Sequence, residues 1–141
     1  MSDRRFVDTN ILVYAHDRSA GVKHEHARRL VEGLWESGDG VLSTQVLQEL
    51  CINLRRKVAN AVPMDEVRQL IREYSTWTII TNGPESIVKA LDLEERYGIS
   101  FWDAMILQAA DDGGASILYT EDLSAGQTYG SVRVINPLTA E

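Results

Sequence analysis

The fold of this chain is decided by the stretch Phe6-Val7-Asp8-Thr9-Asn10-Ile11-Leu12-Val13-Tyr14-Ala15. Its first residues are typical of a short apolar strand, and a helix is predicted directly behind it. Asp8 therefore stands where the strand gives way to the helix. A single aspartate at such a position is usually a helix cap. Whether Asp8 does more depends on which other side chains the fold brings to the same place.

Strand-like and helix-like segments alternate along the rest of the chain. Short apolar runs predict strands at 5–8, 41–43, 77–80, 116–119 and 132–135. Apolar spacings of three and four predict helices at 10–16, 22–35, 45–58, 63–74, 82–97 and 101–111. This order is typical of an α/β fold whose mostly parallel central sheet, with about five short strands, is flanked by helices on both faces. We expect one domain over residues 1–141, without a linker or an internal repeat.

Composition and charge narrow the class of protein. The chain has 141 residues, a net charge of −7 and one cysteine, Cys51, so an internal disulfide and a thiolate metal site are excluded. No apolar run approaches the roughly 20 residues that span a bilayer, and the charged start Met1-Ser2-Asp3-Arg4-Arg5 is not followed by a signal core. We expect a cytoplasmic protein. The acidity by itself argues against a nucleic-acid binder, unless the acids are grouped to hold cations.

Four acids fall near the ends of the predicted strands. In parallel sheets, ligands bind beyond the carboxyl ends of the strands. Asp8 ends the first strand, and Asp122 comes three residues after the fourth. Glu49 lies in the first turns of the helix after the second strand, and Asp103 lies in the first turn of the helix that Ser100 opens. We expect Asp8 and Asp122 at the carboxyl edge, Glu49 close to it, and Asp103 there if its helix points its N-terminus at that edge.

Each acid also has an ordinary structural explanation. Asp8 is a possible cap, Asp122 a turn residue, Glu49 a surface glutamate, and Asp103 the acid of a capping box with Ser100. For any one of them alone, the structural interpretation is the more frequent one.

Two details favour a shared site. Asp103 lies on one helical face with Ile106, Leu107 and Ala110, and Glu49 lies at the edge of an apolar stripe. Acids beside such stripes face inward, where an unpaired carboxylate is costly. Since no Lys or Arg follows either acid at helical spacing, a divalent cation such as Mg²⁺ or Mn²⁺ is the expected partner.

At these residues the sequence resembles the PIN-domain ribonucleases, specifically the VapC-type toxins of type II toxin–antitoxin systems. The likeness covers nearly the whole chain and rests on four stretches in order: Phe6 to Tyr14, Ser43 to Leu50, Ser100-Phe101-Trp102-Asp103-Ala104, and Leu118-Tyr119-Thr120-Glu121-Asp122-Leu123. Together, on an alternating α/β chain, these stretches make a strong match.

The resemblance implies a set of functional expectations. Asp8, Glu49, Asp103 and Asp122 would be the catalytic acids and would hold one or two Mg²⁺ or Mn²⁺ ions. The activity would be endonucleolytic cleavage of RNA, the partners a small antitoxin whose tail masks the site and a second copy in a homodimer. An acidic groove is suited to a basic antitoxin tail. Thr9, Asn10 and Thr120 match the small polar residues around the family's site.

The chemistry can also be argued from the residues. Asp8 and Asp103 would be the main metal ligands, and Glu49 and Asp122 would complete the cluster directly or through water. A metal-activated water would attack the phosphorus in line. Thr120 and Asn10 would orient the ligands, with Asn10 as the support of Asp8.

Two other functions fit part of the pattern. A phosphatase or a receiver-like phosphoryl-transfer domain also places acids at strand ends. A receiver needs a lysine near the last strands, however, and none follows Lys89, while an Asp-x-Asp phosphatase needs a second aspartate where Asn10 stands. A non-catalytic module that binds a basic peptide in the acidic groove is the third hypothesis, and a lack of Mn²⁺ uptake would favour it.

Overall fold

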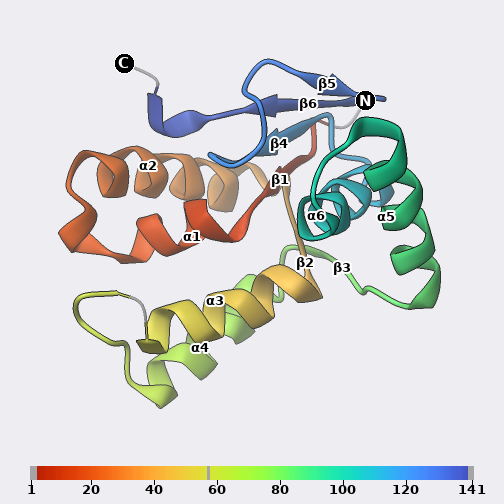
Figure 1. Ribbon diagram of the computed structural model, residues 1–141. Helices are drawn as coiled ribbons and strands as arrows, with labels where there is room; N and C mark the ends of the chain where they lie inside the picture. The colour runs from red at the N-terminus through yellow and green to blue at the C-terminus, as the bar shows by residue number, and fades with distance from the viewer. Residues whose placement is uncertain (1–2, 57, 140–141) are drawn as a thin grey trace.

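A computed structural model describes residues 3–56 and 58–139 of the chain (Figure 1). The α-helices in this part are α1 (Thr9–His16), α2 (Val22–Ser37), α3 (Thr44–Arg56), α4 (Met64–Tyr74), α5 (Pro84–Tyr97) and α6 (Phe101–Asp112). The strands are β1 (Arg5–Val7), β2 (Gly40–Ser43), β3 (Thr78–Ile80), β4 (Ile117–Tyr119), β5 (Thr128–Tyr129) and β6 (Val132–Ile135). Two short 3-10 helices are η1 (Arg18–Ala20) and η2 (Pro137–Thr139). The predicted α/β fold with a mostly parallel sheet is confirmed.

The six strands form one sheet in the order β3-β2-β1-β4-β6-β5. All neighbouring pairs are parallel except β5 with β6. The chain runs outward from β1 to β2 and β3, and then returns to place β4 on the other side of β1. β1 and β4 therefore flank the point at which the strand order reverses, where open α/β sheets bind their ligands.

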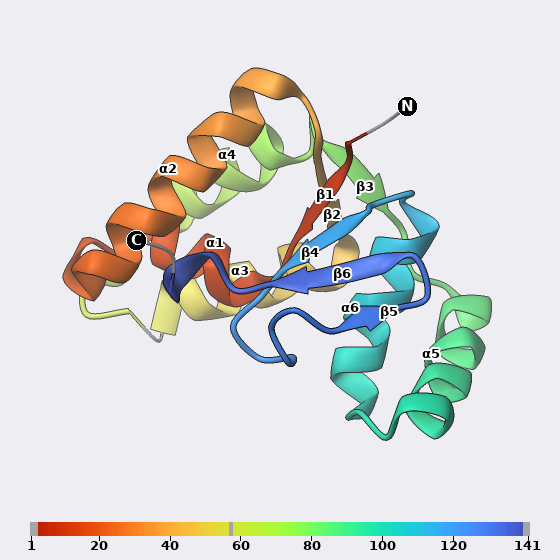
Figure 2. The same cartoon turned by 90° about the horizontal axis from the view of Figure 1, so that it is seen from above.

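The helices lie on both faces of the sheet because the chain changes direction at this point. Connections between parallel strands are almost always right-handed. The connections from β1 to β2 and from β2 to β3 run in one direction across the sheet, and the connection from β3 to β4 runs in the other, so their helices lie on opposite faces. Figure 2 shows α1 to α4 on one side of the sheet and α5 and α6 on the other. The central strands are consequently covered on both faces, and Phe6, Val7, Val41, Leu42 and Leu118 are fully buried. This explains their unbroken apolar sequence.

An aromatic cluster holds the edge strand β3 against β2. The ring of Trp77, just before β3, lies 5.2 Å from the rings of both Trp35 and Tyr74, measured between centroids. Gly40 begins β2 directly beneath it, and a Cβ at this position would overlap the Trp77 ring. The absence of a side chain at Gly40 is therefore a packing requirement.

The structure differs from the sequence prediction in a few places. The helix predicted to reach Val58 ends at Arg56, and Lys57 lies outside the described residues, as do Met1 and Ser2. The antiparallel strand β5 was not predicted, because two residues are too few to carry a periodic pattern. None of the helices in the described part of the chain is long and apolar enough to cross a membrane.

Candidate active site

A cavity of about 430 Å³ lies beside the carboxyl ends of β1, β2 and β4. Its walls are formed by Asp8, Thr9, Asn10, Val13, Tyr14, Asp17, Glu49, Asn53 and Asp122. Three of the four acids identified in the sequence therefore line one cavity, although they come from three separate segments. The fourth, Asp103, is not a wall residue.

Asp8 follows β1 and is the N-cap of α1. Its Oδ1 accepts a hydrogen bond from the Thr9 amide (2.7 Å), and its Oδ2 accepts one from the Thr120 hydroxyl (2.8 Å). The residue is only 6% exposed, and burial raises the pKa of its carboxyl to about 7, with smaller contributions from the charges of Asp122 and Glu49. A carboxylate accepts about four hydrogen bonds. Capping of α1 therefore leaves Asp8 free to bind a further group.

Glu49 reaches the cavity from α3. Its Oε1 accepts a hydrogen bond from the Thr9 hydroxyl (2.6 Å), and its Oε2 accepts one from the Gln45 amide (3.2 Å). Thr9 thus contacts two of the acids, with its backbone amide on Asp8 and its hydroxyl on Glu49. This position fits the supporting role expected of Thr9.

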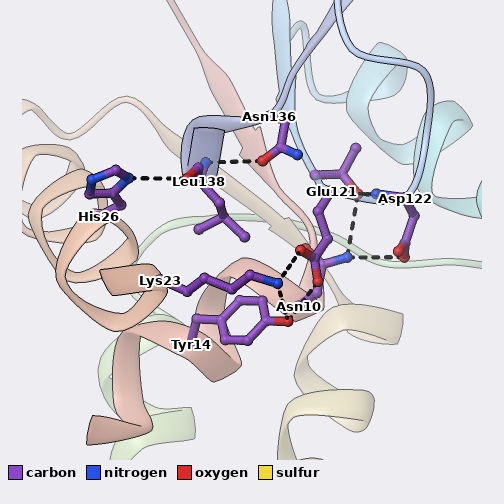
Figure 3. A network of polar contacts seen from close by, with 9 residues as sticks. Asn10, Tyr14, Lys23, His26, Glu121, Asp122, Asn136 and Leu138 are labelled. Carbon is purple, nitrogen blue, oxygen red and sulfur yellow. Dashed lines mark hydrogen bonds and ion pairs between the residues drawn. The ribbon is translucent and has the colours of Figure 1, made fainter. Parts of the chain in front are cut away.

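Asp122 is exposed and lies in the loop after β4, facing Asn10 (Figure 3). The Asn10 amide donates to Asp122 Oδ2 (3.0 Å) and lies 3.4 Å from Thr120 Oγ1, which also accepts from the Asp122 amide (3.1 Å). Burial, followed by the charge of Asp103, raises the pKa of the Asp122 carboxyl. Within the described residues, Asn10 makes no direct hydrogen bond to Asp8, as its expected support would: its amide donates to Asp122, and Thr120 is the side chain that donates to Asp8.

Asp103 lies in the first turn of α6, which Ser100 caps through a hydrogen bond from the Asp103 amide (3.1 Å). A capping box would also need the Asp103 carboxylate to accept from the Ser100 amide. Among the residues that the structure describes, this carboxylate accepts no hydrogen bond, so the capping box is not formed. Its charge instead acts on Asp122.

In the part of the chain that the structure describes, the four acids have no basic partner. Within residues 3–56 and 58–139, none of the four forms an ion pair with Lys or Arg. In the same part of the chain, no three His, Cys, Asp or Glu side chains converge closely enough to hold one metal ion. Asp8, Glu49 and Asp122 instead accept hydrogen bonds from hydroxyl and amide groups.

The chemistry of the donors nevertheless suits a divalent cation. Carboxylate and amide oxygens are the ligands that hard cations such as Mg²⁺ prefer. Two buried amide oxygens beside the acids, Asn10 Oδ1 and Gln45 Oε1, have no hydrogen-bond partner among the described residues. Unused oxygen donors and mutually repelling carboxylates are both features that a bound cation would satisfy.

Besides the apolar Val13, three polar cavity residues were not found by sequence reasoning: Tyr14, Asp17 and Asn53. The signal for two of them was present. Tyr14 stands four residues after Asn10 and Asn53 four residues after Glu49, so each lies on the same helical face as a residue already identified.

Comparison with known proteins identifies a family. A family model described as the PIN domain matches residues 5–129 of the chain. Among curated proteins, none matches.

Solved structures of similar fold cover most of the chain. A toxin–antitoxin complex from Klebsiella pneumoniae shares 20% identity and a TM-score of 0.68, over 94% of this chain and 97% of that one. VapC20 of Mycobacterium tuberculosis, described as a sarcin-ricin loop cleaving toxin, shares 21% identity and a TM-score of 0.64, over 84% and 91%. VapBC2 from Rickettsia felis, bound to a promoter DNA fragment, shares 20% identity and a TM-score of 0.60, over 92% and 96%. At these identities the likeness is one of fold.

Proposed function

This chain belongs to the PIN-domain family, and from that premise we propose that it is a Mg²⁺- or Mn²⁺-dependent endoribonuclease that acts as the toxin of a toxin–antitoxin pair. One observation carries the proposal. Asp8, Glu49 and Asp122 line a single cavity at the reversal point of the sheet, and Asp103 is close enough to raise the pKa of Asp122. The toxins and toxin–antitoxin complexes among proteins of similar fold support the same assignment.

Asp8 and Asp103 would be the main metal ligands, with Glu49 and Asp122 completing the set. A bound cation would supply the positive charge that activates a water and stabilises the charge developing on the phosphoryl oxygens. The chain itself contributes orientation, since side chains that hold metal ligands in place tune both affinity and activity. Thr120 and Thr9 hold the Asp8 carboxylate.

Orientation of Asp122 is the role we assign to Asn10. The amide of Asn10 holds one oxygen of the Asp122 carboxylate and leaves the other free. Asp122 is exposed, so this contact limits the positions of an otherwise mobile side chain. Together, Thr9, Asn10 and Thr120 contact the side chains of three of the four acids, which are Asp8, Glu49 and Asp122.

Two protein partners belong to the proposal. A basic antitoxin tail would mask the acidic cavity through charge complementarity. A second copy of the chain would cover the apolar side chains exposed on α5 and at the start of α6, which are Ile87, Val88, Leu91 and Trp102, each 45% to 63% exposed. Exposed apolar groups of this kind mark protein interfaces. Light scattering tests the dimer, and a monomer for the wild-type protein would contradict it.

RNA cleavage by the antitoxin-free protein tests the function. We expect cleavage with Mg²⁺ or Mn²⁺, inhibition by EDTA, and loss of cleavage in Asp8→Asn. Sequencing the ends of the fragments identifies the target. If the wild-type protein and Asp8→Asn degrade RNA equally, a contaminating nuclease explains the activity and the proposal fails.

A non-catalytic groove that binds a basic peptide is the second candidate. It is favoured by the lack of convergence of three ligating side chains on one position within the described residues. Titration with Mn²⁺ in a calorimeter separates the two. Uptake that disappears in Asp8→Asn supports the nuclease, whereas no uptake by the wild-type protein favours the peptide-binding module.

A further inference from the structure

A polar network at the rim of the cavity joins three separate segments of the chain (Figure 3). Lys23, in the first turn of α2, places its Nζ 3.3 Å from Glu121 Oε2 and 3.4 Å from the Tyr14 hydroxyl. The Tyr14 hydroxyl donates to Glu121 Oε1 (2.7 Å), so its oxygen is free to accept from Lys23. The Lys23 ammonium also lies 5.0 Å from the centre of the Tyr14 ring. These contacts hold one positive charge in a defined place.

That place adjoins the candidate active site, because Tyr14 is itself a wall of the acidic cavity. Every charged residue among the walls is an acid: Asp8, Asp17, Glu49 and Asp122. A strand of RNA brings a negative charge with every nucleotide, so phosphates that flank the cleaved bond meet repulsion unless a cation receives them. Lys23 is an ammonium already fixed at this rim.

The network leaves Lys23 able to bind a further anion. An ammonium has three N–H donors, and Glu121 and Tyr14 engage two of them. The Lys23 side chain is 51% exposed, against 23% for Glu121. The third donor therefore faces solvent, while the carboxylate behind it is the more covered of the pair.

We propose that Lys23 binds a backbone phosphate of the RNA next to the bond that is cut, and that Tyr14 and Glu121 are its positioning residues. The inference rests on the proposed ribonuclease function. The alternative is an ordinary surface ion pair, which contributes little to stability. The contact of Lys23 with a wall of the cavity distinguishes it from the other ion pairs of the described chain, such as Lys89 with Asp111 and Asp112.

The test compares Lys23→Met with Lys89→Met. Both variants remove an ion-paired lysine and keep an unbranched side chain, but only the first lies at the cavity. For Lys23→Met we expect KM for RNA to rise about tenfold with kcat nearly unchanged, as for loss of one hydrogen bond to a charged group. Lys23→Arg restores most of the loss, and Lys89→Met behaves as wild type.

Binding at several salt concentrations tests the same contact without cleavage. In an Asp103→Asn background, which keeps the RNA intact, Lys23→Met should flatten the plot of log affinity against log salt by about 0.7, the value for one phosphate contact to a single strand. Glu121→Gln should keep the wild-type slope, because the lysine remains.

Three results decide the matter. The proposal is overturned if Lys23→Met has the KM and salt slope of Lys89→Met, or if Lys23→Met and Glu121→Gln weaken RNA binding equally, as loss of a structural ion pair would. Lack of cleavage by the wild-type protein would instead contradict the ribonuclease function. The salt slope still decides the role of Lys23 in that case.

Discussion

The two ends of helix α6 carry acids in opposite circumstances. At its C-terminal end, Asp111 and Asp112 share Lys89, whose Nζ lies 2.7 Å from the first carboxylate and 2.6 Å from the second. At its N-terminal end, the charge of Asp103 raises the pKa of Asp122, and neither is paired with a basic side chain in the described part of the chain. Asp122 lines the acidic cavity, and the charge of Asp103 acts on it.

The two groups of acids differ in how their charge is balanced. Carboxylates at a helix C-terminus meet the negative end of the helix dipole, and Lys89 compensates them. The acids around the cavity keep their mutual repulsion, which contributes to the raised pKa of Asp8 and of Asp122. Such perturbed groups in a cleft are typical of functional sites. The cluster that lacks a basic partner among the described residues is the one for which we propose an external cation.

Exchange of one aspartate at each end of α6 should give the largest contrast. Asp103→Asn should reduce RNA cleavage by about 10²–10⁴-fold, because a bound metal contributes several kcal/mol to transition-state stabilisation. Asp111→Asn should leave cleavage unchanged. Initial rates on one RNA substrate provide the measurement, and equal losses in both variants would remove the distinction between the two clusters.

The free energy of unfolding should depend on pH because Asp8 is a buried acid. Because the pKa of Asp8 is raised to about 7, the folded protein binds a proton there that the unfolded chain releases near pH 4. This contribution to the free energy of unfolding is fully present below pH 4 and is lost as the pH rises through 7. Its size is on the order of 4 kcal/mol.

Urea unfolding of metal-free protein from pH 4 to pH 8 measures the effect, with Asp8→Asn as the comparison. The variant cannot ionise at this position, so the difference between the two proteins should grow in favour of Asp8→Asn as the pH rises. A difference that stays constant over this range would show that Asp8 ionises normally in the folded protein.

Loss of the Thr120 hydroxyl, which holds Asp8, should reduce cleavage less than loss of one of the acids. Thr120→Val keeps the shape of the buried side chain and removes the hydroxyl that donates to Asp8. We expect cleavage to fall about 10–100-fold, the usual cost of losing a group that orients a metal ligand. Thr76→Val removes the hydroxyl of an exposed threonine that bonds a backbone carbonyl, and it should have no effect on the rate.

Removal of the lysine that neutralises Asp111 and Asp112 should have the smallest effect on stability and cleavage. Lys89→Met should lower the free energy of unfolding by at most about 1 kcal/mol, because partly exposed ion pairs contribute little. Its RNA cleavage should match that of the wild-type protein. Thermal unfolding in low and high salt gives the measurement, and a much larger loss would mean that the two aspartates at this helix end depend on their lysine.

Local features of the molecule were predictable from the sequence. The strand before Asp8, the cap at Ser100 and the end of α5 at Gly98 each depend on a few neighbouring residues. The same local signals indicated that Asp8 and Asp122 follow strands. The strand β5 was not predicted, because its two residues are too few to carry a pattern.

Contacts between distant residues were not predictable in the same way. Asn10 was expected to support Asp8, and its amide instead donates to Asp122, which lies 112 residues along the chain. One of the two partners of Lys23 is also distant, since Glu121 is 98 residues along the chain. Each of these contacts depends on how side chains pack at the edge of the sheet, and the spacing of apolar residues along the chain does not predict it.

The sequence by itself determined the order and approximate position of most strands and helices of this protein, and that an acid follows the first and fourth strands. These properties arise from hydrogen bonds and side-chain spacings within single segments. Only the tertiary structure decided which of these residues meet. Asp8 and Thr120 are 112 residues apart, and they touch because β4 returns to lie beside β1. Strand order follows from packing of the whole domain and from the handedness of its crossovers.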